Sequence, residues 1–542
     1  MMNWHRERWG RRAILPTILA IVLASVLAVV SAQEPKYGGT LIVGVTGEPT
    51  TIDVLTGSLI TGVITNLVCE GLIADDVMAV GETFADLIPV LATGWTVSDD
   101  GLVYTFDLQR DVNFHDGTPF NAQAVVVNFE RFMNPESPIY DATARTAVAA
   151  RSRRIESYRA VDDHTFELTL SEPWGSFLRN FKHRAFAIVS PAALEAGVGQ
   201  MDHTFLDCTG PFRIIEREQG VRVVLERNPD YWNSANRNGG PYLDQVVFQV
   251  IPDPSARIAA LQTGQIDVDI DIPADRVADL SRDPNLVVEL PGHPHVYYLV
   301  PNFAHEATND VRVRQAIWHA IDVDGMVTSL FGDTAVPLHG LFPPGNPAYR
   351  PGFERPFPYD QERARALLAD AGYADGLTLE YMYPITGASY MDSPQIAQWI
   401  QSNLREVGVT VDLRPLEVAA WSAALRPGMD PGIALAINGL QSVADDPNFI
   451  EQYWHTRNHR PAGSNFSFYE NPEVDTLLDV AAVQTVEEEW IDAYHAAEDA
   501  LLADAGVIPM AHYKHPKAFG VNVQNLRLGP SFWFDVTEVW LD

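Results

Sequence analysis

The sequence lacks the motifs on which most enzyme chemistry depends. No lysine is preceded by glycine and followed by serine or threonine, and neither HExxH nor GxSxG occurs. These absences exclude a P-loop nucleotide site, a zincin-type metal site and a serine-hydrolase elbow. The only cysteines are Cys69 and Cys208, and neither has a basic neighbour in sequence to activate a thiolate.

Positive charge is also scarce. Lysine and arginine number 37 against 71 acidic residues, so the formal net charge is −34. Such an acidic surface excludes nucleic acid and anionic membrane as expected partners. Solubility and genomic bias are the simplest explanations for this acidity, with a preference for cationic ligands or a salty environment as the alternative.

Long apolar runs are confined to the N-terminus. Arginines precede an apolar segment at residues 13–30, and Val30–Ser31–Ala32 offers small residues for cleavage. This pattern predicts a signal peptide over residues 1–32 and a periplasmic or extracellular protein. No cysteine lies at the cut, so a lipoprotein is not expected. An uncleaved anchor is the alternative, and a twin-arginine signal is the alternative to an ordinary secretory one.

The two cysteines have two interpretations. An even pair in an exported protein permits one disulfide. The alternative is two buried free thiols, and the sequence alone does not decide between them.

The length of the chain and its pattern of expected helices and strands predict several structural units. A chain of 542 residues exceeds one ordinary core, so two or three units are expected. Leu41, Val43 and Val45 alternate as a strand. Past about residue 293, helices and strands alternate: Asp360 can cap a helix that Gly372 ends, and residues 487–503 form another helical segment. This alternation predicts an α/β fold.

Residues 91–131 are the most informative stretch. Trp95 and Val97 alternate with polar residues before a turn at residues 98–101, and a second strand follows. His115 and Asp116 begin a polar corner, where we interpret them as hydrogen-bonding residues that do not contact ligand. Asn121 can then cap a helix over residues 122–131.

This stretch resembles the signature region of the family-5 extracellular solute-binding proteins, which bind dipeptides, oligopeptides or nickel for ABC importers. Further blocks similar to the family follow one another in the family's order. They are residues 38–44 (GGTLIVG), 228–232 (NPDYW), 261–267 (LQTGQID), 310–322 (DVRVRQAIWHAID), 366–373 (ALLADAGY) and 467–478 (SFYENPEVDTLL). The arginines Arg312 and Arg314 within one block are interpreted as structural ion pairs.

The resemblance implies a bilobal periplasmic-binding-protein (clamshell) fold of the large class, with an extra subdomain inserted in lobe I. The expected division places lobe I at residues 33–74, 190–292 and 513–542, the inserted subdomain at 75–189 and lobe II at 293–512. Two chain crossings near Gly292 and His512 would form the hinge.

The resemblance also implies where ligand binds. In peptide-binding relatives, an aspartate three residues before an Asp-Pro pair holds the peptide's amino group, shortly after a Gly-Trp pair. Here the pair is Asp446–Pro447, Val443 stands at the anchor position, and Leu440 follows Gly439. Asp445 could replace the anchor. The predicted ligand is a peptide or similar small organic solute, with an oligosaccharide or an opine-like compound as alternatives.

A hinged binder needs polar anchors and stacking aromatics in its cleft. For the aromatics, core packing is the alternative, and for Glu48 a loop-capping role. The predicted ligand-binding residues are Glu48, Thr50, Tyr383, Trp421, Asn438, Asp445, Asp446 and Tyr469.

No catalytic residue, metal or cofactor is predicted. His293 and His295, with His512 and His515, form the best histidine group, but we interpret them as polar hinge residues. Acidic pairs such as Asp162–Asp163 suggest a glycosidase only weakly, because chance pairs are expected among 71 acids.

The predicted function is the extracytoplasmic solute-binding component of an ABC importer, delivering ligand to a membrane permease served by separate ATPase subunits. We expect a monomer that is not an enzyme. The alternatives are a secreted, glycosidase-like hydrolase and a ligand receptor for sensing without transport.

Overall fold

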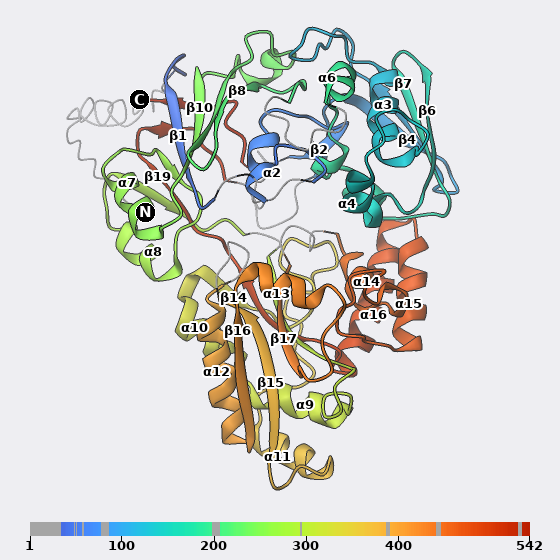
Figure 1. Cartoon of the computed structure of the whole chain (residues 1–542), viewed down its shortest axis with the longest axis vertical. Coiled ribbons are helices and arrows are strands. Elements are labelled where there is room, and N and C mark those ends of the chain that lie inside the picture. The colour runs from blue at the N-terminus through green and yellow to red at the C-terminus, as the bar shows by residue number, and fades with distance from the viewer. Residues whose placement is uncertain are drawn as a thin grey trace, which may run out of the picture. The chain divides into compact units, whose positions relative to one another are not determined.

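Strand β1 (Thr40–Val45) lies inside a seven-stranded sheet. Leu41, Val43 and Val45 are fully buried, as their alternation predicts. The strand order is β12-β19-β11-β1-β10-β9-β8. The other strands are β8 (Phe212–Glu218), β9 (Arg222–Arg227), β10 (Gln245–Val250), β11 (Val268–Asp269), β12 (Leu286–Glu289) and β19 (Lys517–Gly520). Because β19 lies between β12 and β11, the sheet combines the start, the middle and the end of the chain (Figure 1).

A computed structural model describes residues 34–47, 49, 51–56, 59–76, 86–197, 206–292, 295–385, 391–440, 446–528 and 534–542. Tyr37–Asp542 forms one compact unit, and Met1–Lys36 is a separate unit of which only residues 34–36 are described. The predicted signal peptide therefore lies outside the described residues, as do Glu48, Thr50, His293 and Asp445.

A six-stranded sheet forms in the second half of the chain, in the order β14-β18-β13-β17-β15-β16. Its strands are β13 (Val296–Pro301), β14 (Ala335–Pro337), β15 (Leu377–Pro384), β16 (Val409–Leu416), β17 (Leu435–Leu440) and β18 (Ile508–Tyr513). Every residue of β13 and β18 is buried, because both faces of this sheet are covered.

Helices cover this sheet in the αβ alternation that the sequence predicts. Asp360 caps α11 by accepting from the Arg363 N–H at 2.9 Å, as predicted. The helices of this region are α9 (Val311–Ala320), α10 (Val323–Phe331), α11 (Gln361–Asp370), α12 (Ser393–Glu406), α13 (Val418–Leu425), α14 (Phe449–Trp454), α15 (Pro472–Val483) and α16 (Glu487–Ala503). The predicted ion pairs are also present: Arg312 contacts Asp310 at 2.6 Å and Arg314 contacts Asp504 at 2.7 Å.

A four-stranded antiparallel sheet contains the residue 91–131 stretch, in the order β4-β5-β7-β6. Its strands are β4 (Ala92–Val97), β5 (Val103–Leu108), β6 (Ile155–Asp162) and β7 (Thr165–Leu170), with helices α3 (Ala122–Met133), α4 (Ala142–Ser152), α5 (Phe177–Phe181) and α6 (Pro191–Ala196) nearby in the chain. Asn121 caps α3 by accepting from the Ala124 N–H at 2.9 Å, which confirms the predicted hairpin, corner and helix.

The polar corner is built by hydrogen bonds. Asp116 accepts from the Thr118 N–H at 2.8 Å and from the Thr118 hydroxyl at 2.5 Å. A ring nitrogen of His115 lies 2.9 Å from the Gly210 carbonyl oxygen. These contacts confirm that both side chains form the corner.

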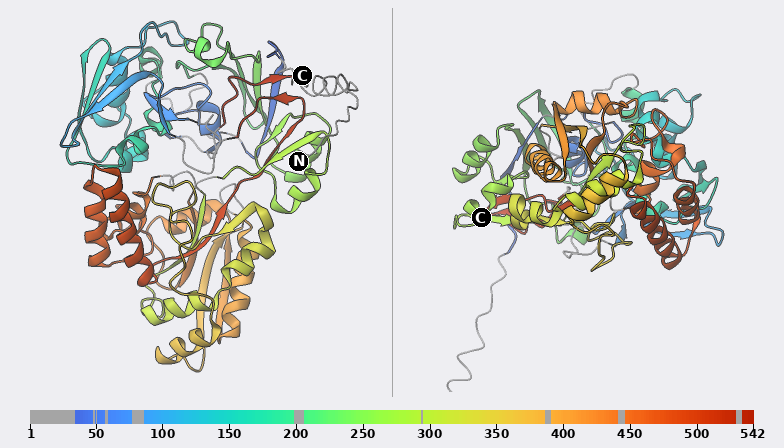
Figure 2. Two further views of the ribbon diagram at one scale, coloured as in Figure 1. Left: turned by 180° about the vertical axis from the view of Figure 1, so that it is seen from behind. Right: turned by 90° about the horizontal axis from the view of Figure 1, so that it is seen from below.

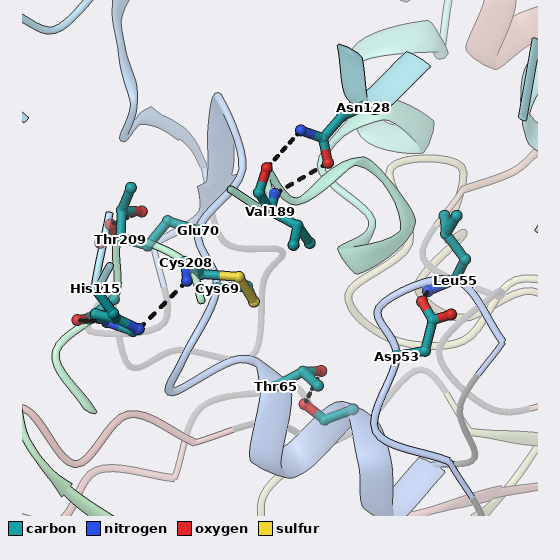
Figure 3. The surroundings of a disulfide bond; sticks show 12 residues. Asp53, Leu55, Thr65, Cys69, Glu70, His115, Asn128, Val189, Cys208 and Thr209 are labelled. Carbon is teal, nitrogen blue, oxygen red and sulfur yellow. Dashed lines mark hydrogen bonds between the residues drawn. A yellow bond between two sulfur atoms is a disulfide. The ribbon is translucent and has the colours of Figure 1, made fainter. Parts of the chain in front are cut away.

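Cys69 and Cys208 form a disulfide, which decides between the two interpretations of the pair. Figure 3 shows the bond beside His115, a ring nitrogen of which accepts from the Cys208 N–H at 3.3 Å. Next to the bond, Glu70 accepts from the Thr209 hydroxyl at 2.8 Å, and burial raises the pKa of that carboxyl. The disulfide therefore ties together two segments 139 residues apart.

The chain passes between the two large sheets twice. It leaves the seven-stranded sheet after β12 and enters the six-stranded sheet at β13, and it returns from β18 to β19. The return is the red segment that links the two sheets in Figure 2.

Candidate functional site

Three parallel strands of the six-stranded sheet end at one edge. Strand β15 pairs in parallel with both β16 and β17, so Pro384, Leu416 and Leu440 lie at the same carboxyl edge. Antiparallel β13 begins there, since Val296 pairs with Leu440, and His512 near the end of β18 pairs with Val296 as well. Both crossings to the seven-stranded sheet therefore reach this carboxyl edge.

Helices α12 and α14, which follow β15 and β17 in the chain, lie on opposite faces of the sheet. Successive residues of a strand point to opposite faces of the sheet. The contacts of Tyr297 therefore show what covers one face, and those of Tyr298 show what covers the other. The Tyr297 hydroxyl accepts from the Met391 N–H at 2.8 Å, just before α12, whereas the Tyr298 ring stacks on Phe449 of α14. In an open α/β sheet, a crevice between diverging connections at the carboxyl edge is the usual ligand site.

Two predicted aromatics belong to this edge. Tyr383 is the second-last residue of β15 and lies 5.4 Å from the Tyr381 ring, measured between centroids. Trp421 lies in α13, which follows β16 directly, and is 6% exposed. Packing buries most of each ring, and burial raises the pKa of the Tyr383 hydroxyl.

Two predicted polar residues follow on the neighbouring strand. Asn438 lies in β17 two residues before its end, paired with Tyr298, and is 5% exposed. Among the described residues, its Nδ2 is buried and has no hydrogen-bond partner. Asp446 belongs to the connection from β17 to α14 and accepts from the Asn448 N–H at 2.9 Å. A buried donor without a partner is unfavourable unless another acceptor reaches it.

Tyr469 lies elsewhere. Its ring packs against Phe303 at 4.8 Å and is fully buried. Phe303 follows the end of β13, which runs antiparallel to β17, so Tyr469 lies at the edge opposite the carboxyl edge. The structure therefore brings together Tyr383, Trp421, Asn438 and Asp446, but not Tyr469.

Histidines and a buried lysine surround the crossings. The rings of His295 and His515 lie 5.8 Å apart, and His515 lies 3.4 Å from an Asp271 carboxylate oxygen. Burial lowers the pKa of His515 to well below its ordinary value and lowers the pKa of Lys517 to about 7, against the opposing effect of Glu289.

Within the described ranges, no group of three metal-ligating side chains has the arrangement of a metal site. Lys517 was not among the predicted residues, although the basic run at residues 512–517 could have drawn attention to it.

A cavity of about 390 Å³ lies between α10, β14 and α16. Its charged groups have partners: Arg350 contacts Glu498 at 2.5 Å, and Asp324 lies 2.6 Å from Arg355. Burial raises the pKa of Glu498 to about 7. The carboxyl edge, where Asn438 Nδ2 has no partner within the described part of the chain, remains the better candidate site.

Comparison with known proteins decides the family. The family described as "Bacterial extracellular solute-binding proteins, family 5 Middle" matches residues 86–460. The chain belongs to this family. Glutathione-binding protein GsiB of Pectobacterium atrosepticum is 32% identical to the family-5 protein over 429 residues, covering 78% of this chain and 80% of the relative.

Solved structures agree with this family-5 assignment. The ABC transporter-associated periplasmic binding protein DppA from Helicobacter pylori, in complex with peptide STSA, is 26% identical, with a TM-score of 0.78 over 93% of this chain and 98% of that chain. HbpA2 from Haemophilus parasuis is 25% identical, with a TM-score of 0.79 over 93% and 100%. The predicted bilobal fold is therefore confirmed.

The family-5 protein is the substrate-binding component of an ABC importer, which acts with a permease and ATPase subunits. The family and these relatives are binding proteins of transporters and not enzymes. Over the ranges that the structure describes, we find no helix with the length and apolarity needed to span a bilayer.

Proposed function

We propose that this family-5 protein captures a short peptide or peptide-like solute at the carboxyl edge of the six-stranded sheet. The observation that carries the proposal is the buried Asn438 amide at this edge, whose Nδ2 has no hydrogen-bond partner among the described residues, with α12 and α14 on opposite faces of the sheet. A peptide offers carbonyl oxygens that Asn438 can donate to, and the relatives' names include glutathione- and peptide-binding proteins. Glutathione is the first ligand to test.

The proposed site consists of Tyr383, Trp421, Asn438 and Asp446. Glu48, Thr50 and Asp445 are added on the sequence argument alone, since they lie outside the described residues. Tyr469 is left out because it packs at the opposite edge of the sheet. With Val443 at the usual anchor position, we propose that the ligand's amino group is held by Asp445 or Asp446.

Titration calorimetry with glutathione, di- and tripeptides, an opine and an oligosaccharide tests the ligand class. A peptide-class ligand is expected to bind tightly and to raise the melting temperature, because binding to the native state stabilises it by RT ln(1 + [L]/Kd). Asn438→Ala removes one hydrogen bond and should weaken binding about tenfold. Binding of the opine or the oligosaccharide alone would overturn the peptide proposal.

Asn236→Ala is the matched control for Asn438→Ala. Asn236 is exposed, and its amide donates to Asn233, within the same loop, at 2.8 Å. The control should bind as the wild type does. Equal affinity of wild type and Asn438→Ala would remove Asn438 from the site.

We also propose that the protein is exported through cleavage after Ala32, is not lipid-modified and catalyses no reaction. Both cysteines belong to the disulfide, which leaves no thiol for a lipid anchor. Mass spectrometry of the exported protein should find an N-terminus near Gln33, and intact ligand should be recovered after incubation. A retained N-terminus or chemically altered ligand would contradict these points.

We propose the predicted domain division as well: lobe I at residues 33–74, 190–292 and 513–542, the inserted subdomain at 75–189, and lobe II at 293–512. The sheets support this division. All strands of the seven-stranded sheet fall in lobe I, those of the four-stranded sheet in the inserted subdomain, and those of the six-stranded sheet in lobe II, apart from the last residue of β18. Limited proteolysis should cut at the more exposed crossing, near residues 290–292, before it cuts within any of these sheets. First cuts inside a sheet would contradict the division.

A further inference from the structure

The four-stranded sheet and its neighbouring loops contact the helices of the six-stranded sheet directly. The connection between α15 and α16 approaches two glycines of that region. A Cβ on Gly175 would lie 1.9 Å from the Gln484 carbonyl oxygen, and one on Gly101 would lie 2.5 Å from Thr485 Cγ2. Such distances leave no room for a methyl group. These two regions therefore touch at a third place, apart from the two chain crossings.

Charged side chains take part in this contact. Arg153, just after α4, lies 2.5 Å from Oε2 of Glu451 in α14, and Glu451 is fully buried. Arg457 contacts the other oxygen of Glu451 at 2.5 Å. Burial raises the pKa of Glu451, but the two guanidinium groups outweigh burial and hold that pKa below its ordinary value. Glu451 is therefore ionised at neutral pH.

Arg154 extends the contact. Its guanidinium donates to the Ala482 carbonyl oxygen at 2.8 Å and lies over the Trp174 ring, 5.4 Å from its centroid. Contacts built from charges and backbone carbonyls can separate, because water replaces the lost partners, whereas a purely apolar contact resists exposure. The chemistry of this contact therefore suits a joint that opens and closes.

The position of the contact favours the same conclusion. Both crossings lie at the β13–β18 side of the carboxyl edge. The contact between α4 and α14–α16 lies on the other side of the molecule from the segment joining β18 to β19, as the views in Figures 1 and 2 agree. Rotation about the crossings therefore separates these residues, which lie farther from the axis.

Glu451 is also linked to the proposed ligand site. Asp446 and Glu451 belong to one short segment, in which Asp446 accepts from the Asn448 N–H at 2.9 Å. The Tyr494 hydroxyl of α16 donates to the Asn448 side chain at 3.1 Å. A ligand that fixes Asp446 therefore also fixes the start of α14, where Glu451 receives Arg153.

We propose that Arg153 and Glu451 form a latch that joins the region of the four-stranded sheet to α14 in the closed form, which the ligand-free protein also populates and which ligand stabilises further. The two residues are positioning residues, since they stabilise the closed form without touching ligand. The latch rests on the proposed function, because it assigns closure to capture at the carboxyl edge. A ligand held in a latched cleft should leave more slowly, and loss of one charged contact should change that rate about tenfold.

The experiment compares the wild type with Arg153→Ala and Arg159→Ala. Arg159 is the matched control, because its 2.7 Å pair with Glu167 stays within the four-stranded sheet and is exposed. We expect Arg153→Ala to increase the radius of gyration of the ligand-free protein in small-angle X-ray scattering. We also expect glutathione to dissociate about tenfold faster, with an association rate within twofold of the wild type. Arg159→Ala should match the wild type in each measurement.

A second variant guards against a folding defect. Arg153→Lys keeps the charge and should recover most of the wild-type radius and dissociation rate, while a melting temperature near that of the wild type shows that both variants fold. An unchanged radius of gyration in Arg153→Ala would overturn the latch and identify a fixed joint. If glutathione fails to bind any variant, the ligand proposal fails, but the scattering result still decides the latch.

Discussion

The seven-stranded and six-stranded sheets are stabilised in different ways. The six-stranded sheet comes from one continuous stretch of chain, and its strands β13 and β18 are buried at every position. The seven-stranded sheet is assembled from distant segments, and its strand β8 alternates between buried and exposed residues. The continuous sheet relies on apolar burial on both faces. The discontinuous one has a larger entropy of chain closure to overcome, because its strands come from segments that are far apart in the chain.

A disulfide and buried ion pairs stabilise the region of the seven-stranded sheet and offset its entropy of chain closure. The disulfide joins segments 139 residues apart, and Arg131 contacts Asp53 at 2.5 Å across 78 residues of chain. Arg257 and Asp269, both fully buried, form a further pair at 2.6 Å. Of these links, the disulfide alone is covalent, so it also restricts the unfolded chain, and this effect grows with the length of the loop that the bond closes.

Removal of the disulfide should change the difference in stability between the two regions most strongly. The double variant Cys69→Ala and Cys208→Ala is expected to lose about 4 kcal/mol of unfolding free energy in the seven-stranded region, because the bond closes a long loop. Calorimetry should show an earlier transition in that region. Treatment of the wild type with reductant should reproduce it, and unchanged melting would show that the link is dispensable.

A mutation that creates a cavity in the core of the six-stranded region should have the next largest effect. Ile400 of α12 is fully buried, and Ile400→Ala should lower the free energy of unfolding by about 3 kcal/mol, measured in urea. Gln398→Ala, on the exposed face of the same helix, is the control and should stay within about 0.5 kcal/mol of the wild type. Similar losses for both variants would argue against burial as the source of stability.

Lys517 tests the junction between the regions through pH. Its folded pKa of about 7 lies below the ordinary value of 10.5, so between these values the unfolded chain binds more protons and the stability from this group rises with pH. The difference in unfolding free energy, wild type minus Lys517→Met, should therefore increase by on the order of 2 to 3 kcal/mol from pH 7 to pH 10. A difference that stays constant with pH would show that Lys517 has an ordinary pKa.

The helix cap at Asp360 should give the smallest effect. Asp360→Ala removes the acceptor for the Arg363 N–H and should cost about 1 kcal/mol. Asp360→Ser, which can still cap, should recover most of the loss in thermal unfolding. A loss as large as that of Ile400→Ala would show that local helix signals matter more here than burial.

Local features could be predicted from the sequence and distant ones could not. The cap at Asn121 and the strand from Thr40 to Val45 depend on neighbouring residues, and both are present. The pairing of Arg153 with Glu451 spans 298 residues and leaves no periodic signal. Tyr383 and Asn438 could be placed near strand ends from the strand pattern, and both lie near the carboxyl ends of β15 and β17. The position of Tyr469 could not be predicted, because sequence spacing does not reveal which edge of a sheet an aromatic ring occupies.

Strand β19 is made late in synthesis, although it lies inside the seven-stranded sheet. The ribosome makes β11 and β12 more than 200 residues before Lys517–Gly520, yet β19 is the only strand between them. Until the last residues emerge, β12 has no neighbour in the sheet and β11 exposes an unpaired edge. The seven-stranded sheet therefore stays incomplete until translation has passed Gly520, and the region built on it cannot finish folding before nearly the whole chain has been made.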